Sequence, residues 1–248
     1  MTAYIGEFIG TAILLILGAG VVANVSLTKT LANGNTPWLL ITTGWGLAVF
    51  VAVYITGQWS GAHLNPAVTL SLALTEKMAW SLVPGYIIAQ ILGAMTGSAL
   101  IYLHYRPHFD LTEDEATIKG CFCTGPAIPN TFQNLFSEVF GTFILVFAIF
   151  YLSGPKLVVN GINSDQFGLG SLDALPVGLL VWVIGISLGG TTGYAINPAR
   201  DFGPRIVYAL LRGRKGNPDW SYAWIPIVGP MIGAALASGA YLLLEKMN

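Results

Sequence analysis

Six apolar runs, each close to the length that crosses a bilayer, constrain this chain more than any other feature of its sequence. A membrane-spanning helix needs about 20 mostly apolar residues. The runs cover roughly residues 4–25, 38–56, 81–104, 133–153, 173–188 and 222–244. Only 9% of all residues are charged, whereas a soluble domain carries about a quarter. The sequence therefore predicts an all-α membrane protein with six transmembrane helices.

The remaining composition narrows the class of protein further. The net charge of −1 does not point to a nucleic-acid partner. Cys121 and Cys123 lie in a polar connection, and their C-x-C spacing favours two surface or interfacial thiols over a disulfide or a metal site. The residues before the first run include no basic segment and no cleavage site, so we expect this run to be a retained helix. No paired nucleophile and base, no cofactor motif and no metal motif stands out.

The chain reads as a duplication. The sequence G-E-F-I-G-T at residues 6–11 returns as S-E-V-F-G-T 131 residues later, and Asn-Pro-Ala at 65–67 returns 132 residues later at 197–199. The repeat halves, about 1–105 and 133–248, are joined by a polar loop with an acidic cluster at 110–115, which we interpret as a solvated linker. Each half holds three spans, an odd number, so the halves must cross the membrane in opposite senses as inverted repeats. We expect residues 1–248 to form a single domain.

Each Asn-Pro-Ala copy opens an apolar segment that is too short to span the bilayer. Asn is a favoured N-cap and Pro a favoured first helical residue. One copy alone would favour an ordinary helix start, but two copies at one repeat offset predict two re-entrant half-helices whose N-termini meet near the midplane. The non-helical residues before each copy must then turn their carbonyl groups toward a pore. The carbonyls that we expect to line it belong to Gly61, Ala62, His63, Gly193 and Ala195.

The paired Asn-Pro-Ala motifs (Asn65, Pro66, Ala67 and Asn197, Pro198, Ala199), the Glu-x-x-Gly-Thr repeat and the six-plus-two arrangement resemble the major intrinsic protein family over essentially the whole chain. This family comprises the aquaporins and aquaglyceroporins. The resemblance implies a passive channel without enzyme activity, in which pore diameter, lining groups and electrostatic barriers set selectivity. It also implies a homotetramer with one pore per subunit.

Four positions match the selectivity filter of that family, namely Trp45, Gly185, Tyr194 and Arg200. Trp45 and Gly185 match glycerol-conducting members, in which the absence of a histidine should widen the constriction. Tyr194 departs from the phenylalanine that is common there, so its additional hydroxyl either narrows the pore or adds a hydrogen bond. Arg200 opposes the helix dipole and is costly in an apolar setting. We therefore expect it to act in the filter, with an ion pair to Asp201 as the alternative.

Further positions resemble the glycerol-conducting subgroup: Asp201, Arg205, Pro226 and Ile227. Glu7 and Glu138 occupy matching positions in the two halves, and the family implies that they brace the re-entrant loops. A proton or cation site of a transporter is the alternative for these two acids. His63 is expected to contribute its carbonyl to the pore and its ring to the support of the loop.

The sequence thus predicts a channel for glycerol, water and other small neutral solutes that excludes ions and protons. A water-selective channel, a channel for small weak acids such as protonated lactic acid, and a coupled secondary transporter are the alternatives. The lack of long charged tails points to a bacterial plasma membrane, and the resemblance implies that both termini lie in the cytoplasm. The distribution of basic residues favours the opposite orientation, because cytoplasmic loops usually carry the excess of Lys and Arg. The family topology puts Lys77, Lys156 and Lys246 inside but Lys29, Arg106, Lys119, Arg212, Arg214 and Lys215 outside.

Overall fold

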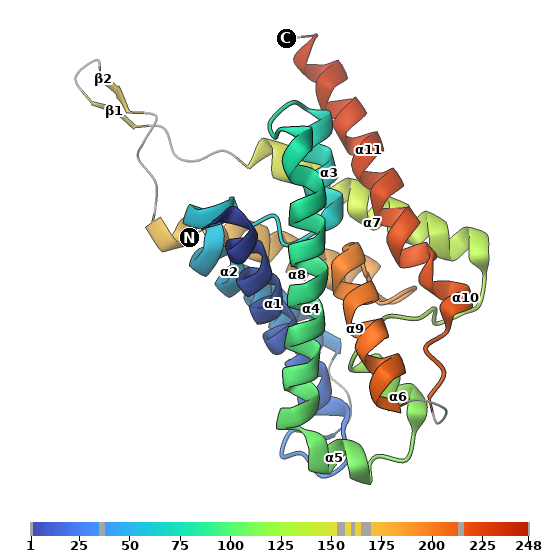
Figure 1. The fold of residues 1–248 in the computed structure, drawn as a ribbon. Helices are drawn as coiled ribbons and strands as arrows, with labels where there is room; N and C mark the ends of the chain where they lie inside the picture. Colours follow the sequence, from blue (N-terminus) through green and yellow to red (C-terminus); the bar gives the residue numbers. More distant parts are fainter. Residues whose placement is uncertain are drawn as a thin grey trace.

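The computed structural model describes residues 2–34, 38–152, 157–159, 162–164, 170–212 and 216–247. In chain order the elements are α1 (Ala3–Ser26), α2 (Trp38–Ser60), α3 (Pro66–Leu74), the 3-10 turn η1 (Trp80–Leu82), α4 (Val83–His104), α5 (Arg106–Leu111), α6 (Glu115–Gly120), α7 (Thr131–Tyr151), β1 (Leu157–Val159), β2 (Ile162–Ser164), η2 (Gly170–Ala174), α8 (Leu175–Leu188), α9 (Pro198–Arg212), α10 (Trp220–Ala223) and α11 (Ile225–Glu245). The two strands form a small antiparallel hairpin that stands away from the helices (Figure 1). The predicted all-α membrane fold is confirmed.

Five helices among the described residues are long and apolar enough to cross a membrane: α1, α2, α4 with η1, α7, and α10 with α11. The fifth predicted span, at residues 173–188, is present at the predicted position and is the shortest of the six. The helix α8 has 14 residues, and with the preceding turn the apolar helix covers Leu172–Leu188. At about 1.5 Å per residue, α8 alone is near 21 Å long, which is short of the 30 Å or so of a hydrocarbon core.

The helices of each half pack in the same pairs. In the first half α1 contacts α4, and in the second half α7 contacts α11. Both pairs approach closely at a glycine: a Cβ atom at Gly93 would overlap the carbonyl oxygen of Phe8, and one at Gly233 would overlap that of Val139. Glycine at these two crossings therefore allows close helix packing within one chain.

The two predicted half-helices are present as α3 and α9, of 9 and 15 residues. The helix α3 packs on α11, and α9 packs on α4, so each half-helix is held mainly by a span of the other half. Figure 1 shows α9 beside α4, with α3 at the other end of the bundle. This exchange brings the two Asn-Pro-Ala copies into the centre of the molecule.

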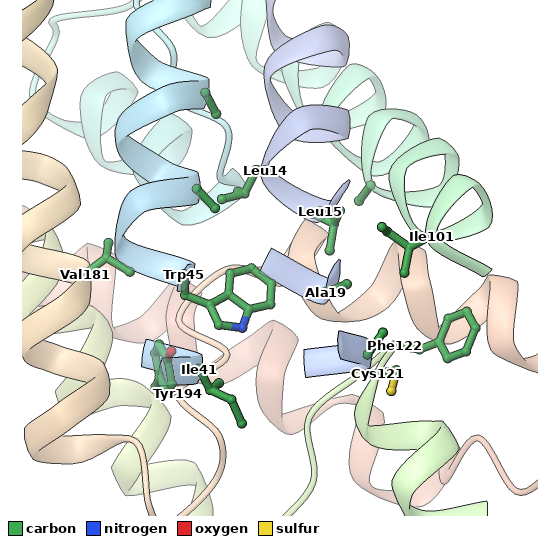
Figure 2. Close-up of a cluster of buried hydrophobic side chains, with 14 of the residues drawn as sticks. Leu14, Leu15, Ala19, Ile41, Trp45, Ile101, Cys121, Phe122, Val181 and Tyr194 are labelled. Atoms are coloured by element: carbon green, nitrogen blue, oxygen red, sulfur yellow. The ribbon is translucent and has the colours of Figure 1, made fainter. Parts of the chain in front are cut away.

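The connection between the halves differs from the solvated linker that the sequence predicted. Asp110, Glu113 and Asp114 are exposed, but α5 and α6 carry buried residues, and Phe109 and Ile118 are almost fully enclosed. The prediction of surface or interfacial thiols is wrong as well, because Cys121 and Cys123 are buried free cysteines. Phe122 and Cys121 lie in the same cluster as Ile101 of α4 (Figure 2). The buried apolar residues of this connection therefore pack it against the end of the helical bundle.

Candidate functional site

The two half-helices begin against each other. The Nδ2 atom of Asn65 donates a hydrogen bond to the carbonyl oxygen of Ile196 at 2.8 Å, and that of Asn197 donates to the carbonyl of Leu64, also at 2.8 Å. Each Asn Oδ1 atom accepts the N–H two residues further along its own half-helix, at 2.9 and 3.0 Å. The two caps are therefore cross-linked, and the positive ends of both half-helix dipoles meet at one point.

The residues before each cap have a strained backbone, at equivalent positions of the two repeats. In the first half Gly61, Ala62 and Leu64 have φ angles of +78°, +48° and +50°. The equivalents Gly193, Tyr194 and Ile196 have φ angles of +76°, +38° and +42°. A non-glycine residue in the left-handed region costs on the order of 1–3 kcal/mol and persists only where its surroundings hold it.

Two buried carboxylates hold these strained segments. Glu7 accepts the N–H of His63 at 2.9 Å and that of Leu64 at 2.7 Å. Glu138 repeats the arrangement with Ala195 at 3.0 Å and Ile196 at 2.8 Å. Both glutamates are fully enclosed. Their oxygen atoms are occupied by protein donors, which leaves little capacity for an ion.

A polar cluster further supports the first segment. Gln90 Nε2 donates to Glu7 at 2.8 Å and to the hydroxyl of Thr69 at 2.9 Å. The same hydroxyl lies 3.1 Å from Nδ1 of His63, whose ring packs on Tyr86 with centroids 4.8 Å apart. Gln90 was not among the residues predicted from the sequence, although an isolated glutamine within an apolar run is a usable signal.

A central cavity of about 180 Å³ passes both caps. One set of its lining residues is apolar: Leu14, Val49, Val53, Val68, Leu72, Leu145, Ile149, Val177 and Val181. The other set carries the polar groups: the residues 61–65 and 194–197, with Trp45 and Arg200. The cavity therefore offers apolar wall and hydrogen-bonding groups together.

The backbone of the lining segments contributes acceptors. Within the described residues, the carbonyl groups of Gly61, Ala62, His63 and Ala195 accept no protein hydrogen bond, and all four residues line the cavity. Gly193 does not line it. A Cβ atom on Gly193 would lie 3.2 Å from the methyl carbon of Thr124, so the side-chain position of this glycine faces the connection between the halves, and a pore-lining role of its carbonyl stays a prediction.

Arg200 and two aromatic residues gather on one part of the cavity wall. The guanidinium carbon of Arg200 lies 4.3 Å from the centroid of the Trp45 ring. Tyr194 lines the same cavity, and Trp45, Tyr194, Leu14 and Val181 belong to one buried cluster (Figure 2). Among the described residues no protein acceptor bonds the Arg200 guanidinium. Its donors are therefore available to a molecule in the cavity.

Gly185 lies behind this wall and does not line the cavity. A Cβ atom there would be 2.8 Å from Cζ of Tyr194 and 2.9 Å from a methyl carbon of Thr42. The space that a larger side chain would occupy is filled by the Tyr194 ring, which also packs edge-on against Trp38. Trp38 Nε1 donates to the Gly185 carbonyl at 3.0 Å and so fixes α8 to α2. The small residue at position 185 thus leaves room for the Tyr194 ring, and a constriction wider than one with a histidine there stays a prediction.

Asp201 pairs with Arg205 and not with Arg200. Both partners are completely enclosed, and Nη2 of Arg205 lies 2.8 Å from Oδ1 of Asp201. The second oxygen of Asp201 accepts the N–H and the hydroxyl of Thr124, at 2.7 and 2.6 Å. Arg205 also donates to the carbonyl groups of Thr124 and Pro218. This network ties the segment around Thr124 and the segment around Pro218 to α9, the half-helix that carries Arg200. Nothing in the sequence predicted the role of Thr124.

Pro226 and Ile227 lie in the first turn of α11, where proline is favoured because its missing N–H would be unpaired. Neither residue lines the cavity. Among the described residues, no group of three or more His, Cys, Asp or Glu side chains is placed to hold a metal ion.

The fold and this cavity define a multi-pass membrane protein built as a passive channel, with two capped half-helices meeting inside a helical bundle. The chain belongs to the major intrinsic protein family, whose model matches residues 1–241. It is 52% identical over 238 residues to the glycerol uptake facilitator protein of Streptococcus pneumoniae, covering 96% of this chain and 97% of that one. It is 50% identical over 242 residues to the probable glycerol uptake facilitator protein of Thermotoga maritima, covering 97% and 98%.

A solved structure agrees with these relatives. The X-ray structure of the aquaglyceroporin from Plasmodium falciparum matches with a TM-score of 0.80 at 33% identity, covering 96% of this chain and 93% of that one. The resemblance found in the sequence is confirmed at the level of the family.

Proposed function

We propose that this protein is a passive channel for glycerol and related small uncharged solutes, and for water. The relatives named as glycerol uptake facilitators support this substrate class. Flux measurements on proteoliposomes distinguish this channel from the alternatives, which are a water-selective channel, a channel for protonated lactic acid and a coupled transporter.

One observation carries the proposal: the Arg200 guanidinium has free donors and lies 4.3 Å from the Trp45 ring, on a cavity that is otherwise largely apolar. A polyol has hydroxyl groups along one edge and carbon atoms along the other. The guanidinium donors and the free carbonyl groups can bond the hydroxyls, while Trp45, Tyr194 and the aliphatic side chains contact the carbon backbone. A small neutral polyol therefore exchanges its hydrogen bonds with water for bonds to the wall.

The same cavity opposes cations. The N-termini of α3 and α9 each carry roughly half a positive charge, and the cross-linked caps place these charges together. Arg200 adds a full positive charge to the same path. In aquaporin-type pores in general, an arginine and half-helix dipoles form the barrier to protons and cations, and we assign that role to Asn65, Asn197 and Arg200.

In this proposal Glu7 and Glu138 are positioning residues that brace the carbonyl-lined segments. Trp45, Tyr194 and Arg200 form the selectivity filter, and Gly185 takes part by accommodating Tyr194. Residues 1–248 act as one channel domain with repeat halves at about 1–105 and 133–248.

We further infer that the chain lies in a bacterial plasma membrane as a homotetramer, with both termini in the cytoplasm. This topology places Lys29, Arg106 and Lys119 outside, against the usual bias of basic residues. Three further basic residues that bear on this comparison of the two sides, Lys156, Arg214 and Lys215, lie outside the described residues.

Stopped-flow light scattering on proteoliposomes tests the proposal, with empty liposomes as the control. Water, glycerol, a larger polyol and lactic acid at acidic pH would be compared in the wild type and in Arg200→Val. Fast glycerol flux that saturates only at high concentration and needs no ion gradient is expected. Water flux without glycerol flux would overturn the substrate class, and glycerol uptake that depends on a proton or sodium gradient would overturn the passive channel.

A further inference from the structure

A second hollow lies on the outside of the bundle, between α1 and α4. Its volume of about 520 Å³ exceeds that of the central cavity. Ile16, Leu17 and Val21 of α1 form one wall, and Leu100 and Ile101 of α4 form the other. We refer to it as the α1–α4 groove. Both helices are membrane-spanning by length and composition, so what fills the groove must be compatible with the bilayer interior.

Gly20 accounts for the depth of the groove. It lies on α1 among the lining residues, and a Cβ atom there would meet only the terminal carbon of Ile101, at 3.2 Å. Leu17 and Leu100 are 41% and 47% exposed beside it. The groove is thus an apolar slot along the helices, with a shape suited to a linear hydrocarbon chain.

One end of the groove is polar. Asn24, His104 and Tyr105 close it where α1 and α4 end, at the side of the molecule that carries α5 (Figure 1). The ends of spanning helices lie at headgroup depth, where aromatic and basic side chains are favoured. The groove is therefore apolar along its length and hydrogen-bonding at its interfacial end.

Positive charge flanks that end. Lys29 follows α1, and Arg106 follows α4 as the first residue of α5; both are exposed. Within the described part of the chain neither forms an ion pair, although Asp110 lies one turn beyond Arg106 on α5 and the exposed acids Glu113 and Asp114 follow on the same connection. Exposed cations at headgroup depth attract anionic lipids at about 1 kcal/mol per residue in general.

We propose that the α1–α4 groove binds an anionic phospholipid, with one acyl chain between α1 and α4 and the phosphate near His104 and Arg106. The amphipathic lining, the depth of its polar end and the free cations select this occupant over a neutral lipid. This site is separate from the channel, because none of its lining residues contacts the central cavity.

Native mass spectrometry of the detergent-purified protein tests the proposal, with phosphatidylglycerol and phosphatidylcholine as probes. Gly20→Leu fills the groove, and Gly239→Leu adds the same side chain to an exposed glycine on α11 that has no atom within 4 Å of its Cβ position. The wild type and Gly239→Leu should retain phosphatidylglycerol, and Gly20→Leu should bind it about tenfold more weakly or worse. Glycerol flux should be unchanged in both variants.

A second pair of variants covers the case that Gly20→Leu does not fold. Leu100→Phe fills the groove from α4, and Leu236→Phe changes a comparably exposed leucine on α11 as its control. Arg106→Gln should lower the preference for phosphatidylglycerol over phosphatidylcholine. Equal binding by the groove variants and their controls would overturn the proposal. A change in the number of copies with unchanged lipid binding would instead identify the groove as a contact between copies and would also overturn it.

Discussion

The central carbon of the Arg200 guanidinium lies 4.3 Å from the centroid of the Trp45 ring. A cation–π contact of this kind contributes about 0.5–2 kcal/mol, more where water is excluded. A contact with the ring occupies none of the guanidinium N–H groups in a hydrogen bond to a protein acceptor among the described residues, so the donors stay available. Trp45 is therefore both a wall of the constriction and the support that orients its cation.

Replacement of Trp45 by Ala should relax the size limit of the channel. The variant loses the support of Arg200 and gains empty volume beside it, so the flux ratio of a larger polyol to glycerol should rise several-fold. Stopped-flow measurements on proteoliposomes give this ratio. Val53→Ala, which also widens the cavity on α2 but away from the arginine, serves as the control. An unchanged ratio in Trp45→Ala would exclude Trp45 from the filter.

Glu138→Gln should destabilise the fold without changing whether solute flux depends on an ion gradient. The amide keeps the shape of the carboxylate but can offer only one acceptor oxygen, so one of the two N–H groups of Ala195 and Ile196 loses its partner. An unsatisfied buried group costs about 1–3 kcal/mol. Thermal unfolding in detergent should show a lower Tm, and Glu7→Gln should behave alike. Normal stability together with loss of a proton-dependent flux would instead support the transporter alternative.

Gly185→His alone should fold poorly, and Tyr194→Cys should rescue it. The first side-chain atom at position 185 already crowds the Tyr194 ring and Thr42, and overpacking typically costs about 1–3 kcal/mol. In the double variant the histidine gains the space that the ring leaves. We expect the double variant to pass water while its glycerol flux collapses. Retained glycerol flux in a folded double variant would contradict the assignment of these two positions to the filter.

The fold was largely predictable because its signals are periodic and repeated. The apolar runs located the spans, and the Asn-Pro-Ala copies located both half-helices. The sequence could not show that Tyr194 occupies the space beside Gly185, because that depends on how α2, α8 and a strained loop meet. It also could not show which arginine Asp201 binds. Arg200 is adjacent in the chain, but on a helix the neighbour four residues away lies on the same face, and Arg205 takes that place.

Removal of one partner of the Asp201–Arg205 pair should be more damaging than removal of both. Asp201→Asn leaves a fully buried guanidinium without its countercharge, which in general costs about 3–5 kcal/mol. Combining it with Arg205→Met removes both charges and should recover part of the loss, although the bonds to Thr124 and Pro218 are gone. Tm values of the two single variants and the double variant form the test cycle. Additive losses would mean that the pair makes no coupled contribution.

The two thiols of the connection between the halves should be inert in the folded protein. Burial raises the pKa of Cys121 and of Cys123 from about 9 to about 12, so near pH 8 their thiolate fraction falls about a thousandfold, and the thiolate is the reactive form. Labelling with Ellman's reagent should be slow in detergent and should reach two thiols only after denaturation.

The same burial predicts an alkaline limit of stability. Above pH 9 the unfolded chain releases the thiol protons while the folded chain keeps them up to about pH 12, so the free energy of unfolding decreases as the pH rises through this window. The effect should be smaller in Cys121→Ala with Cys123→Ala, measured as Tm at pH 8 and pH 10 in the same detergent. Rapid labelling of both thiols in the native wild type, or an equal alkaline loss of Tm in the double variant, would show that this connection is open to water and does not form part of the packed core.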